Sequence, residues 1–332
     1  MTDTGERRMM RVEEAVEDIR SVLGSARDIV CMAHKDADAD SLGSALAFAL
    51  ALREMGLRPH PVVPEPVPYL LDYLPGFEMI ETEAPAHDAV FTFDCATVGR
   101  FGERRGLVEN ATVPVVNVDH HVSNTLFGTV NVIEPEASAS GQVVYRLLRA
   151  LDLPIPPAVA TNLYAALLTD TGGFRHENTN EASLRLAADL VAAGADPAWV
   201  ALKSYKSRAT STLRLEALAV AGLKTEAAGR LIWSEVTQAM LAEAGADMQE
   251  SEGVIDQLQS IDTMELAVLF KESRPGSTKI SVRSRGDLDA TRVCIPFGGG
   301  GHLRAAGAEL RVGLEEARAQ VLPVARGLLD VG

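Results

Sequence analysis

The first half of the chain alternates short runs of apolar residues with longer segments in which apolar residues recur at helical spacing. Runs of strand length cover residues 28–33, 89–93 and 114–118, and helical patterns cover residues 41–55, 139–151, 157–168 and 181–193. Strands that alternate with helices predict an α/β fold, with a mostly parallel sheet and helices on both of its faces. Such sheets bind ligands beyond the carboxyl ends of their strands, so we expect a site among the residues that follow each strand.

The second half of the chain has a different pattern. Residues 196–223 are helical in pattern and rich in basic side chains, which indicates a connector, and residues 230–235, 264–272 and 279–284 have the pattern of strands. A chain of 332 residues is long enough for two domains that each bury a core. We therefore predict a first domain over residues 1–195, a helical connector over 196–223, and a second, smaller α/β domain over 224–332.

Charge and composition limit the partners and the location. A net charge of −15 argues against a wide footprint on long nucleic acid, although bound metal ions would still allow small phosphorylated substrates. No apolar run reaches the roughly eighteen residues of a membrane span, and the first residues lack the apolar core of a signal peptide. The three cysteines lie far apart in the sequence, which does not predict a disulfide framework. We expect a cytoplasmic protein without membrane contact.

Carboxylate and imidazole side chains cluster where the predicted strands and one helix end. His34, Asp38 and Asp40 follow the first strand, Asp94 ends the second, Asp119, His120 and His121 end the third, and Asp170 follows the helix over 157–168. Because several of these clusters are delivered by the ends of neighbouring strands, we expect them to meet at one edge of the sheet.

These residue types suit a pair of divalent ions. Two ions about 3.5–4 Å apart need mixed carboxylate and imidazole ligands, with one carboxylate shared. Asp38 and Asp40 lie two residues apart and could point at different ions, and Asp94 is a good candidate for the shared ligand. Mostly oxygen ligands without thiolates favour manganese or magnesium over structural zinc. Each aspartate alone could instead cap a helix, and Asp36 has a spacing that gives it no role, but four clusters together favour a metal site.

The same residues resemble the four motifs of the DHH phosphoesterase superfamily. The motifs are His34-x-x-x-Asp38-x-Asp40-x-Leu42-Gly43, Phe93-Asp94, Asp119-His120-His121 and Thr169-Asp170. The resemblance implies two Mn²⁺ ions per chain, with Mg²⁺ as an alternative: one held by His34, Asp38 and Asp94, and one held by Asp40, Asp94, His120 and Asp170. It also implies two catalytic residues, Asp119, which would orient His120, and His121, which would contact the substrate as a general acid or phosphate ligand.

A glycine-rich segment stands near the C-terminal end, with four successive glycines, residues 298–301, before His302. Such glycines let a backbone pack closely and aim its N–H groups at an anion, and the segment lacks the spacing of a dinucleotide site. Residues 271–304 carry seven basic and three acidic side chains, a net charge of +4 in an acidic protein. Arg283 and Arg285 should share one face of a predicted strand, either as part of a charged, solvated edge or in a binding site. We favour a phosphate pocket made by Arg283, Arg285, Gly299, Gly300, Gly301 and His302.

The glycine-rich segment also resembles the signature of the DHH-associated domain. Size and layout are most similar to the nanoRNase and pAp phosphatase branch, whose members release mononucleotides from very short RNA or hydrolyse the 3′-phosphate of adenosine 3′,5′-bisphosphate (pAp). The resemblance implies a hydrolase whose partners are short RNA or DNA oligonucleotides and small phosphorylated nucleotides. The alternatives are a phosphodiesterase for cyclic or linear dinucleotides, an inorganic pyrophosphatase, a long-chain exonuclease and a non-hydrolysing nucleotide-binding regulator. Apolar helical segments are compatible with a homodimer.

Overall fold

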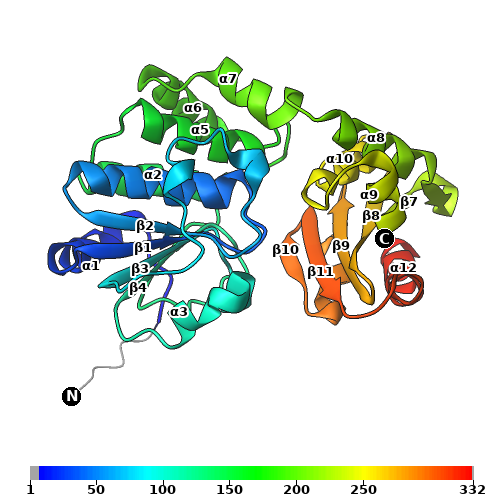
Figure 1. The fold of residues 1–332 in the computed structure, drawn as a ribbon, viewed down its shortest axis with the longest axis horizontal. Coiled ribbons are helices and arrows are strands. Elements are labelled where there is room, and N and C mark those ends of the chain that lie inside the picture. Colours follow the sequence, from blue (N-terminus) through cyan, green and yellow to red (C-terminus); the bar gives the residue numbers. More distant parts are fainter. Residues whose placement is uncertain (1–6, 331–332) are drawn as a thin grey trace. The chain divides into compact units, whose positions relative to one another are not determined.

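The computed structural model describes residues 7–330, and the chain forms two compact units, Met1–Ser207 and Arg208–Gly332 (Figure 1). The division falls inside the predicted connector, whose residues belong to both units. Its first helix, α7 (Pro197–Ala201), belongs to the first unit, whereas α8 (Thr210–Ala221) belongs to the second. None of the helices described is long and apolar enough to cross a membrane.

The first unit contains a five-stranded sheet in which every pair of neighbours is parallel. Its strands are β1 (Asp28–Met32), β2 (Arg58–Val62), β3 (Ala89–Phe93), β4 (Val115–Asp119) and β5 (Val130–Ile133), in the order β2-β1-β3-β4-β5. The predicted parallel sheet is therefore confirmed. The edge strands β2 and β5 lie outside the predicted elements; β2 carries Pro59 and Pro61, which only an edge strand accommodates readily.

Helices cover both faces of this sheet, but unequally. The helices of the first unit, besides α7, are α1 (Val12–Ser25), α2 (Ala39–Glu54), α3 (Gly106–Glu109), α4 (Ser140–Ala150), α5 (Pro157–Asp170) and α6 (Glu181–Ala192). Phe91 of β3 faces a large core shared with α1, α2, α4 and α5, whereas Val90 faces a smaller core closed by Phe101 and Phe127. The helix α2 is buried almost all round because it lies between the sheet and α5 (Figure 1).

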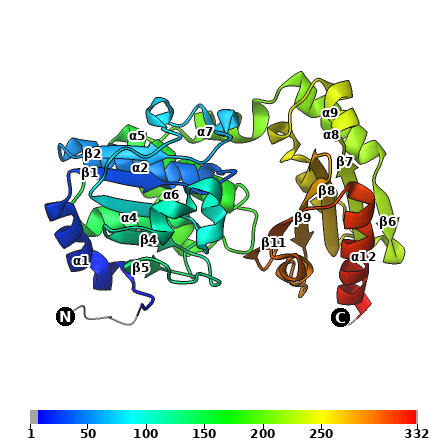
Figure 2. The ribbon, with the colours of Figure 1, turned by 60° about the horizontal axis from the view of Figure 1, so that its bottom comes forward.

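The second unit contains a six-stranded sheet in the order β10-β11-β9-β8-β7-β6. Its strands are β6 (Lys224–Glu226), β7 (Leu231–Val236), β8 (Leu266–Arg274), β9 (Ser277–Ser284), β10 (Gly300–His302) and β11 (Ala305–Leu310). Only the pair β7 and β8 is parallel. The core on one face contains residues of α8, α9 (Gln238–Ala244) and α10 (Val254–Gln259). The core on the other face contains residues of α11 (Thr291–Cys294) and of α12 (Leu314–Asp330), and Figure 2 shows α12 beside the sheet.

Part of the glycine-rich segment is a strand: residues 300–302 form the edge strand β10, antiparallel to β11. A Cβ at Gly299 would clash with the main-chain oxygen of Gly307, and one at Gly301, where φ is +144°, would clash with that of Ala305. These two glycines are therefore required by the close approach of the two strands.

We expect Gly43→Ala to destabilise the first unit. A Cβ at Gly43 in α2 would stand 2.8 Å from the main-chain oxygen of Asn162 in α5, so the two helices would have to move apart. The free energy of unfolding in urea should fall by about 1–3 kcal/mol. The control is Gly24→Ala in α1, where nothing lies within 4 Å and alanine should be neutral or stabilise by up to about 1 kcal/mol. Equal effects of the two changes would contradict the importance of this contact.

Candidate metal centre

The structure brings the predicted carboxylates and imidazoles of the first unit together. His34, Asp94 and His120 follow or end β1, β3 and β4, which are neighbours in the sheet, so they meet at its carboxyl edge. Asp38 and Asp40 stand at the start of α2, and Asp170 is the last residue of α5. Among these side chains are groups of three whose ligand atoms lie within 4.8 Å of one another: His34, Asp38 and Asp94; Asp40, Asp94 and His120; and Asp94, Asp119 and His121.

The first group surrounds the ring of His34. Its Nε2 atom lies 3.6 Å from Oδ2 of Asp94 and 3.9 Å from Oδ2 of Asp38. Its Nδ1 atom lies 2.9 Å from the carbonyl oxygen of Lys35, a contact that holds the ring and directs Nε2 to the carboxylates. Asp38 also caps α2, because its Oδ1 atom accepts a hydrogen bond from the main-chain N–H of Ser41 at 2.9 Å. Asp38 therefore caps the helix with one carboxylate oxygen and faces the ring of His34 with the other.

The second group surrounds the ring of His120. Its Nε2 atom lies 3.4 Å from Asp94 Oδ1, 3.6 Å from Asp170 Oδ2 and 3.8 Å from Asp40 Oδ2. Its Nδ1 atom lies 3.0 Å from the carbonyl oxygen of Ala137. The main chain at Ala137, and not the side chain of Asp119, therefore orients this ring.

Asp94 belongs to both groups. Its Oδ2 atom is directed to His34 and its Oδ1 atom to His120, and Oδ1 also accepts a hydrogen bond from the hydroxyl of Ser140 at 2.8 Å. The residue is 5% exposed and has φ of +58°, a left-handed conformation that aspartate adopts more readily than most residues. One carboxylate directed to two imidazoles is the geometry expected of a ligand shared by two ions.

The start of α4 holds the carboxylate of Asp40. The main-chain N–H groups of Ser140 and Gly141 donate to its Oδ2 and Oδ1 atoms at 2.7 and 2.8 Å. A Cβ at Gly141 would stand 2.6 Å from the Cβ of Ala166, so only glycine allows this approach of α4 to α5. A helix N-terminus thus stabilises one buried charge of the group.

Burial and like charge dominate the electrostatics of these carboxylates. Burial, with the charges of Asp94 and Asp170, raises the pKa of Asp40 well above its usual range, and burial raises the pKa of Asp170 to about 7. Burial would also raise the pKa of Asp94, but hydrogen bonds from His120 and His34 hold it well below its usual value. Buried carboxylates that raise one another's pKa values are relieved when a cation binds among them. The donor set, oxygen with some imidazole nitrogen, therefore fits divalent metal ions.

Asp119 differs from the expectation in its partner. Its Oδ1 atom accepts hydrogen bonds from the main-chain N–H of His120 at 2.8 Å and from Nδ1 of His121 at 2.7 Å, while Oδ2 accepts one from Asn124 at 2.6 Å. The prediction that Asp119 orients the ring of His120 is therefore wrong: it orients His121. Burial would lower the pKa of His121, but the charge and hydrogen bond of Asp119 raise it.

Within the second unit, Arg283 and His302 are brought into one row. Arg283 of β9 pairs with Ala305 of β11, and Ala305 pairs with His302 of β10. Directly paired residues of antiparallel strands project from the same face of a sheet, so Arg283 and His302 flank the small side chain of Ala305. The main chain of β10, which includes Gly300 and Gly301, lies beside this row of side chains, and Gly299 directly precedes the strand.

Arg285 is not part of this row. The strand β9 ends at Ser284, and the Arg285 guanidinium donates to the carbonyl oxygens of Gln259, Asp262 and Ile261 at 2.7, 3.1 and 3.3 Å. It thereby caps the end of α10. The prediction that Arg283 and Arg285 share a strand face is wrong, because Arg285 lies just past the end of β9 and its side chain contacts the end of α10.

Two side chains near the carboxylates lie outside the predicted site. One Nη atom of Arg100 lies 3.1 Å from Nε2 of His34, and the Ser140 hydroxyl contacts Asp94 as described above. Ser140 could have been found from its place at the start of the predicted helix over 139–151. Arg100 lies in a short 3-10 segment, Val98–Arg105, which has no helical or strand pattern to reveal it.

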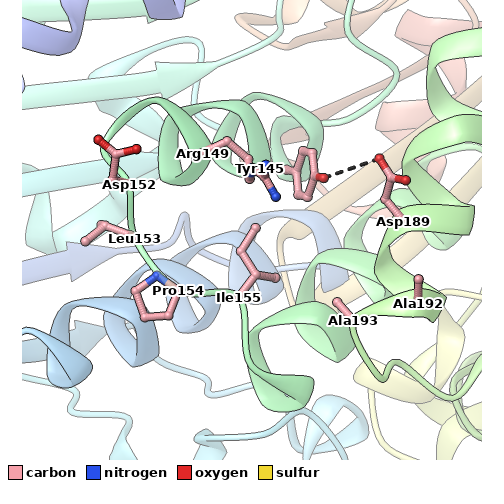
Figure 3. Close-up of a pocket in the computed structure, with 9 residues that line it drawn as sticks. All are labelled: Tyr145, Arg149, Asp152, Leu153, Pro154, Ile155, Asp189, Ala192 and Ala193. Atoms are coloured by element: carbon pink, nitrogen blue, oxygen red, sulfur yellow. Dashed lines mark hydrogen bonds between the residues drawn. The ribbon is translucent and has the colours of Figure 1, made fainter.

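A cavity of about 650 Å³ lies elsewhere in the first unit, between α4 and α6 (Figure 3). Tyr145 and Arg149 of α4 line it together with Asp189 of α6, and the Tyr145 hydroxyl donates to Asp189 at 3.3 Å. None of the predicted site residues lines this cavity. Side-chain chemistry, and not cavity size, therefore identifies the candidate site.

Comparison with known proteins places the chain in a family. Residues 28–167 match the N-terminal domain of the DHH family and residues 230–328 match the DHHA1 domain. The chain is 30% identical over 301 residues to the bifunctional oligoribonuclease and PAP phosphatase NrnA of Thermus thermophilus, covering 88% of this chain and 87% of that protein. The chain belongs to the DHH family, and its second unit carries a DHHA1 domain.

Other relatives are more distant. The bifunctional oligoribonuclease and PAP phosphatase NrnA of Bacillus subtilis is 22% identical over 290 residues, covering 85% of this chain and 89% of that protein. A probable manganese-dependent inorganic pyrophosphatase of Streptococcus agalactiae is 30% identical over 187 residues, 53% of this chain and 58% of that protein. The crystal structure of an exopolyphosphatase-related protein from Bacteroides fragilis shares the fold, with a TM-score of 0.83, 24% identity and coverage of 99% of this chain and 98% of that one.

We expect Asp94→Asn to remove most of the bound metal, because both groups lose the carboxylate they share. Divalent metal retained after desalting, measured by inductively coupled plasma mass spectrometry, should fall towards none. The control is Asp36→Asn, in the loop after β1, where the side chain is exposed and φ is +54°, a conformation that asparagine tolerates. Undiminished loading of the Asp94 variant would refute the assignment.

Proposed function

We propose that this chain is a manganese-dependent phosphoesterase that releases mononucleotides from very short RNA and removes the 3′-phosphate of pAp. The observation that carries the proposal is the buried carboxylate of Asp94, directed by its two oxygens to two imidazoles, with further aspartates beside it. The names of the relatives from Thermus thermophilus and Bacillus subtilis, which cover most of this chain, support the choice of substrates.

Two ions are assigned to the two groups. His34, Asp38 and Asp94 would hold one, and Asp40, Asp94, His120 and Asp170 would hold the other. When bound, such a pair supplies an activated water and positive charge for phosphoryl transfer at neutral pH. The choice of Mn²⁺ over Mg²⁺ rests on the mixed oxygen and nitrogen donors and on the name of the pyrophosphatase relative.

Asp119 and His121 form the proton-transfer pair of the proposed reaction. Asp119 is fully buried and accepts the hydrogen bond from Nδ1 of His121, which keeps a proton on this nitrogen. The other ring nitrogen, Nε2, then donates its proton to the oxygen that leaves phosphorus. The carboxylate also stabilises the positive charge of the ring before the proton is transferred.

The second unit would bind a terminal phosphate of the substrate. The guanidinium of Arg283 provides a charge-assisted hydrogen bond, and His302 projects from the same face of the sheet. The glycines of residues 299–301 leave the main chain of β10 open to close approach by an anion. In a short oligonucleotide the terminal phosphate is a larger fraction of all the phosphates than in a long one. A site for the terminal phosphate would therefore bind short substrates in preference to long ones.

A phosphodiesterase for cyclic or linear dinucleotides stays an alternative, because these substrates present similar phosphates to the same residues. The similarity to a pyrophosphatase is a reason to include pyrophosphate in the same assay. A non-hydrolysing regulator fits less well, because every predicted ligand lies at the candidate centre.

Location and assembly stay predictions. All three cysteines are buried and unpaired, which supports a reducing compartment such as the cytoplasm. A homodimer is tested by light scattering of the purified protein.

The proposed function predicts which substrates are cleaved. With manganese present, 5′-phosphorylated RNAs of 2 to 24 nucleotides should yield mononucleotides fastest at the shortest lengths, and pAp should yield phosphate. Products are separated by ion-exchange chromatography, with cyclic dinucleotides and pyrophosphate assayed in parallel. Turnover of pyrophosphate alone, or equal rates at all RNA lengths, would reject the proposal.

A pair of arginine variants tests the phosphate site. Arg283→Gln should raise KM for pAp at least about 10-fold, because a hydrogen bond to a charged phosphate contributes about 1.5–3 kcal/mol. The matched control is Arg285→Gln, which removes the cap of α10 and should lower the melting temperature without changing KM. Steady-state kinetics and calorimetry distinguish the two; a larger change of KM in the Arg285 variant would reverse the assignment.

A further inference from the structure

A line of buried polar side chains leads through the first sheet to Asp119. Thr92 of β3 and Asn117 of β4 pair in register, and both are fully buried, while Asn124, in the loop after His121, is 8% exposed. Most of their neighbours in these strands are valine or phenylalanine. Polar groups in such positions cost stability unless they are hydrogen-bonded, so their arrangement needs an explanation.

All hydrogen bonds of this line run in one direction. The hydroxyl of Thr92 donates to Oδ1 of Asn117 at 3.1 Å, and Nδ2 of Asn117 donates to Oδ1 of Asn124 at 3.1 Å. Nδ2 of Asn124 then donates to Oδ2 of Asp119 at 2.6 Å. The line therefore ends on the carboxylate that holds His121.

The direction is fixed by a main-chain group. The N–H of Leu126 can only donate, and it lies 2.7 Å from Oδ1 of Asn124. This oxygen is therefore the acceptor end of the Asn124 amide, and the Nδ2 end faces Asp119 and the carbonyl oxygen of Cys95, at 3.2 Å. The reverse orientation of the amide would place its oxygen against the oxygens of Asp119 and Cys95, and its NH2 group against the N–H of Leu126.

We propose that Thr92, Asn117 and Asn124 are positioning residues that fix the Asp119 carboxylate and, through it, the ring of His121. A carboxylate held at one oxygen can rotate, because the terminal torsion of aspartate is broad and roughly two-fold. Asn124 holds Oδ2 while His120 and His121 contact Oδ1, so both ends are fixed. For turnover, the inference rests on the proposed function, in which His121 acts on the substrate.

The first test replaces Asn124 by alanine. With the substrates of the proposed function, kcat should fall about 10- to 100-fold, the range usual for residues that orient a ligand or catalytic group from behind, while KM and bound manganese stay unchanged. The matched control is Asn131→Ala, because Asn131 of β5 is also a buried asparagine, but its amide bonds the main chain of Gly128. Loss of a buried amide alone would affect both variants alike.

The second readout does not depend on activity. In protein labelled with ¹⁵N-histidine, the Nδ1–H proton of the hydrogen bond between His121 and Asp119 gives a downfield NMR signal, assigned with a His121→Asn variant. This signal should shift or broaden in the Asn124 variant and stay in place in the Asn131 variant. An unmoved signal, with kcat lowered no more than in the Asn131 variant, overturns the inference.

A third test uses two variants of Thr92 and applies if the Asn124 variant does not fold. Thr92→Val keeps the shape of the side chain and removes the hydroxyl, whereas Thr92→Ser retains it. The valine variant should shift the His121 signal and lower kcat, and the serine variant should restore both; identical behaviour of the two overturns the inference. If wild-type protein cleaves none of the substrates, the proposed function fails, but the NMR comparison still decides the positioning role.

Discussion

The candidate metal centre of the first unit depends on the contacts of one buried carboxylate, that of Asp94, with two imidazoles. Its two oxygens are directed to His34 and His120, and the other aspartates surround this core at distances that make like charges repel. So much negative charge is stable in a protein interior only when cations, hydrogen bonds or protons compensate it. The fold supplies the hydrogen bonds, and the proposed ions would supply the remaining charge.

The scaffold around this core shows how that compensation is built. The start of α4 points two N–H groups at Asp40, the carbonyl of Ala137 fixes the ring of His120, and the amide of Asn124 holds Asp119. Each of these partners is a main-chain group or a buried amide, and not a flexible charged side chain. The ligands are therefore held in place before any ion binds, which lowers the entropy lost on binding.

The sequence predicts the parallel sheet and the meeting of the acidic clusters because topology alone decides both. Parallel strands place their carboxyl ends at one edge, whatever the details of the loops. The partner of Asp119 could not be predicted, since it depends on loop torsions that send the ring of His121, and not that of His120, towards the carboxylate. Arg285 was assigned wrongly for a similar reason: it lies just past the end of β9, where the loop torsions direct its side chain to the end of α10. The strand β10 could not be predicted from the sequence, because its glycines are set by close packing against β11 and show no alternation of apolar and polar residues.

In the proposed function, the two units would bind anions by different physical means. In the first unit the side chains are carboxylates, so its affinity for a phosphate in the proposed reaction depends on the metal ions that reverse its field. In the second unit the guanidinium of Arg283 stands in a row with His302 beside the main chain of β10, so the phosphate partner is a side chain of the protein itself. Phosphate binding by the second unit should therefore persist without metal, whereas turnover should require it. Such a division would let an acidic protein, with a net charge of −15, bind small phosphorylated molecules although its surface has few basic side chains to contact long nucleic acid.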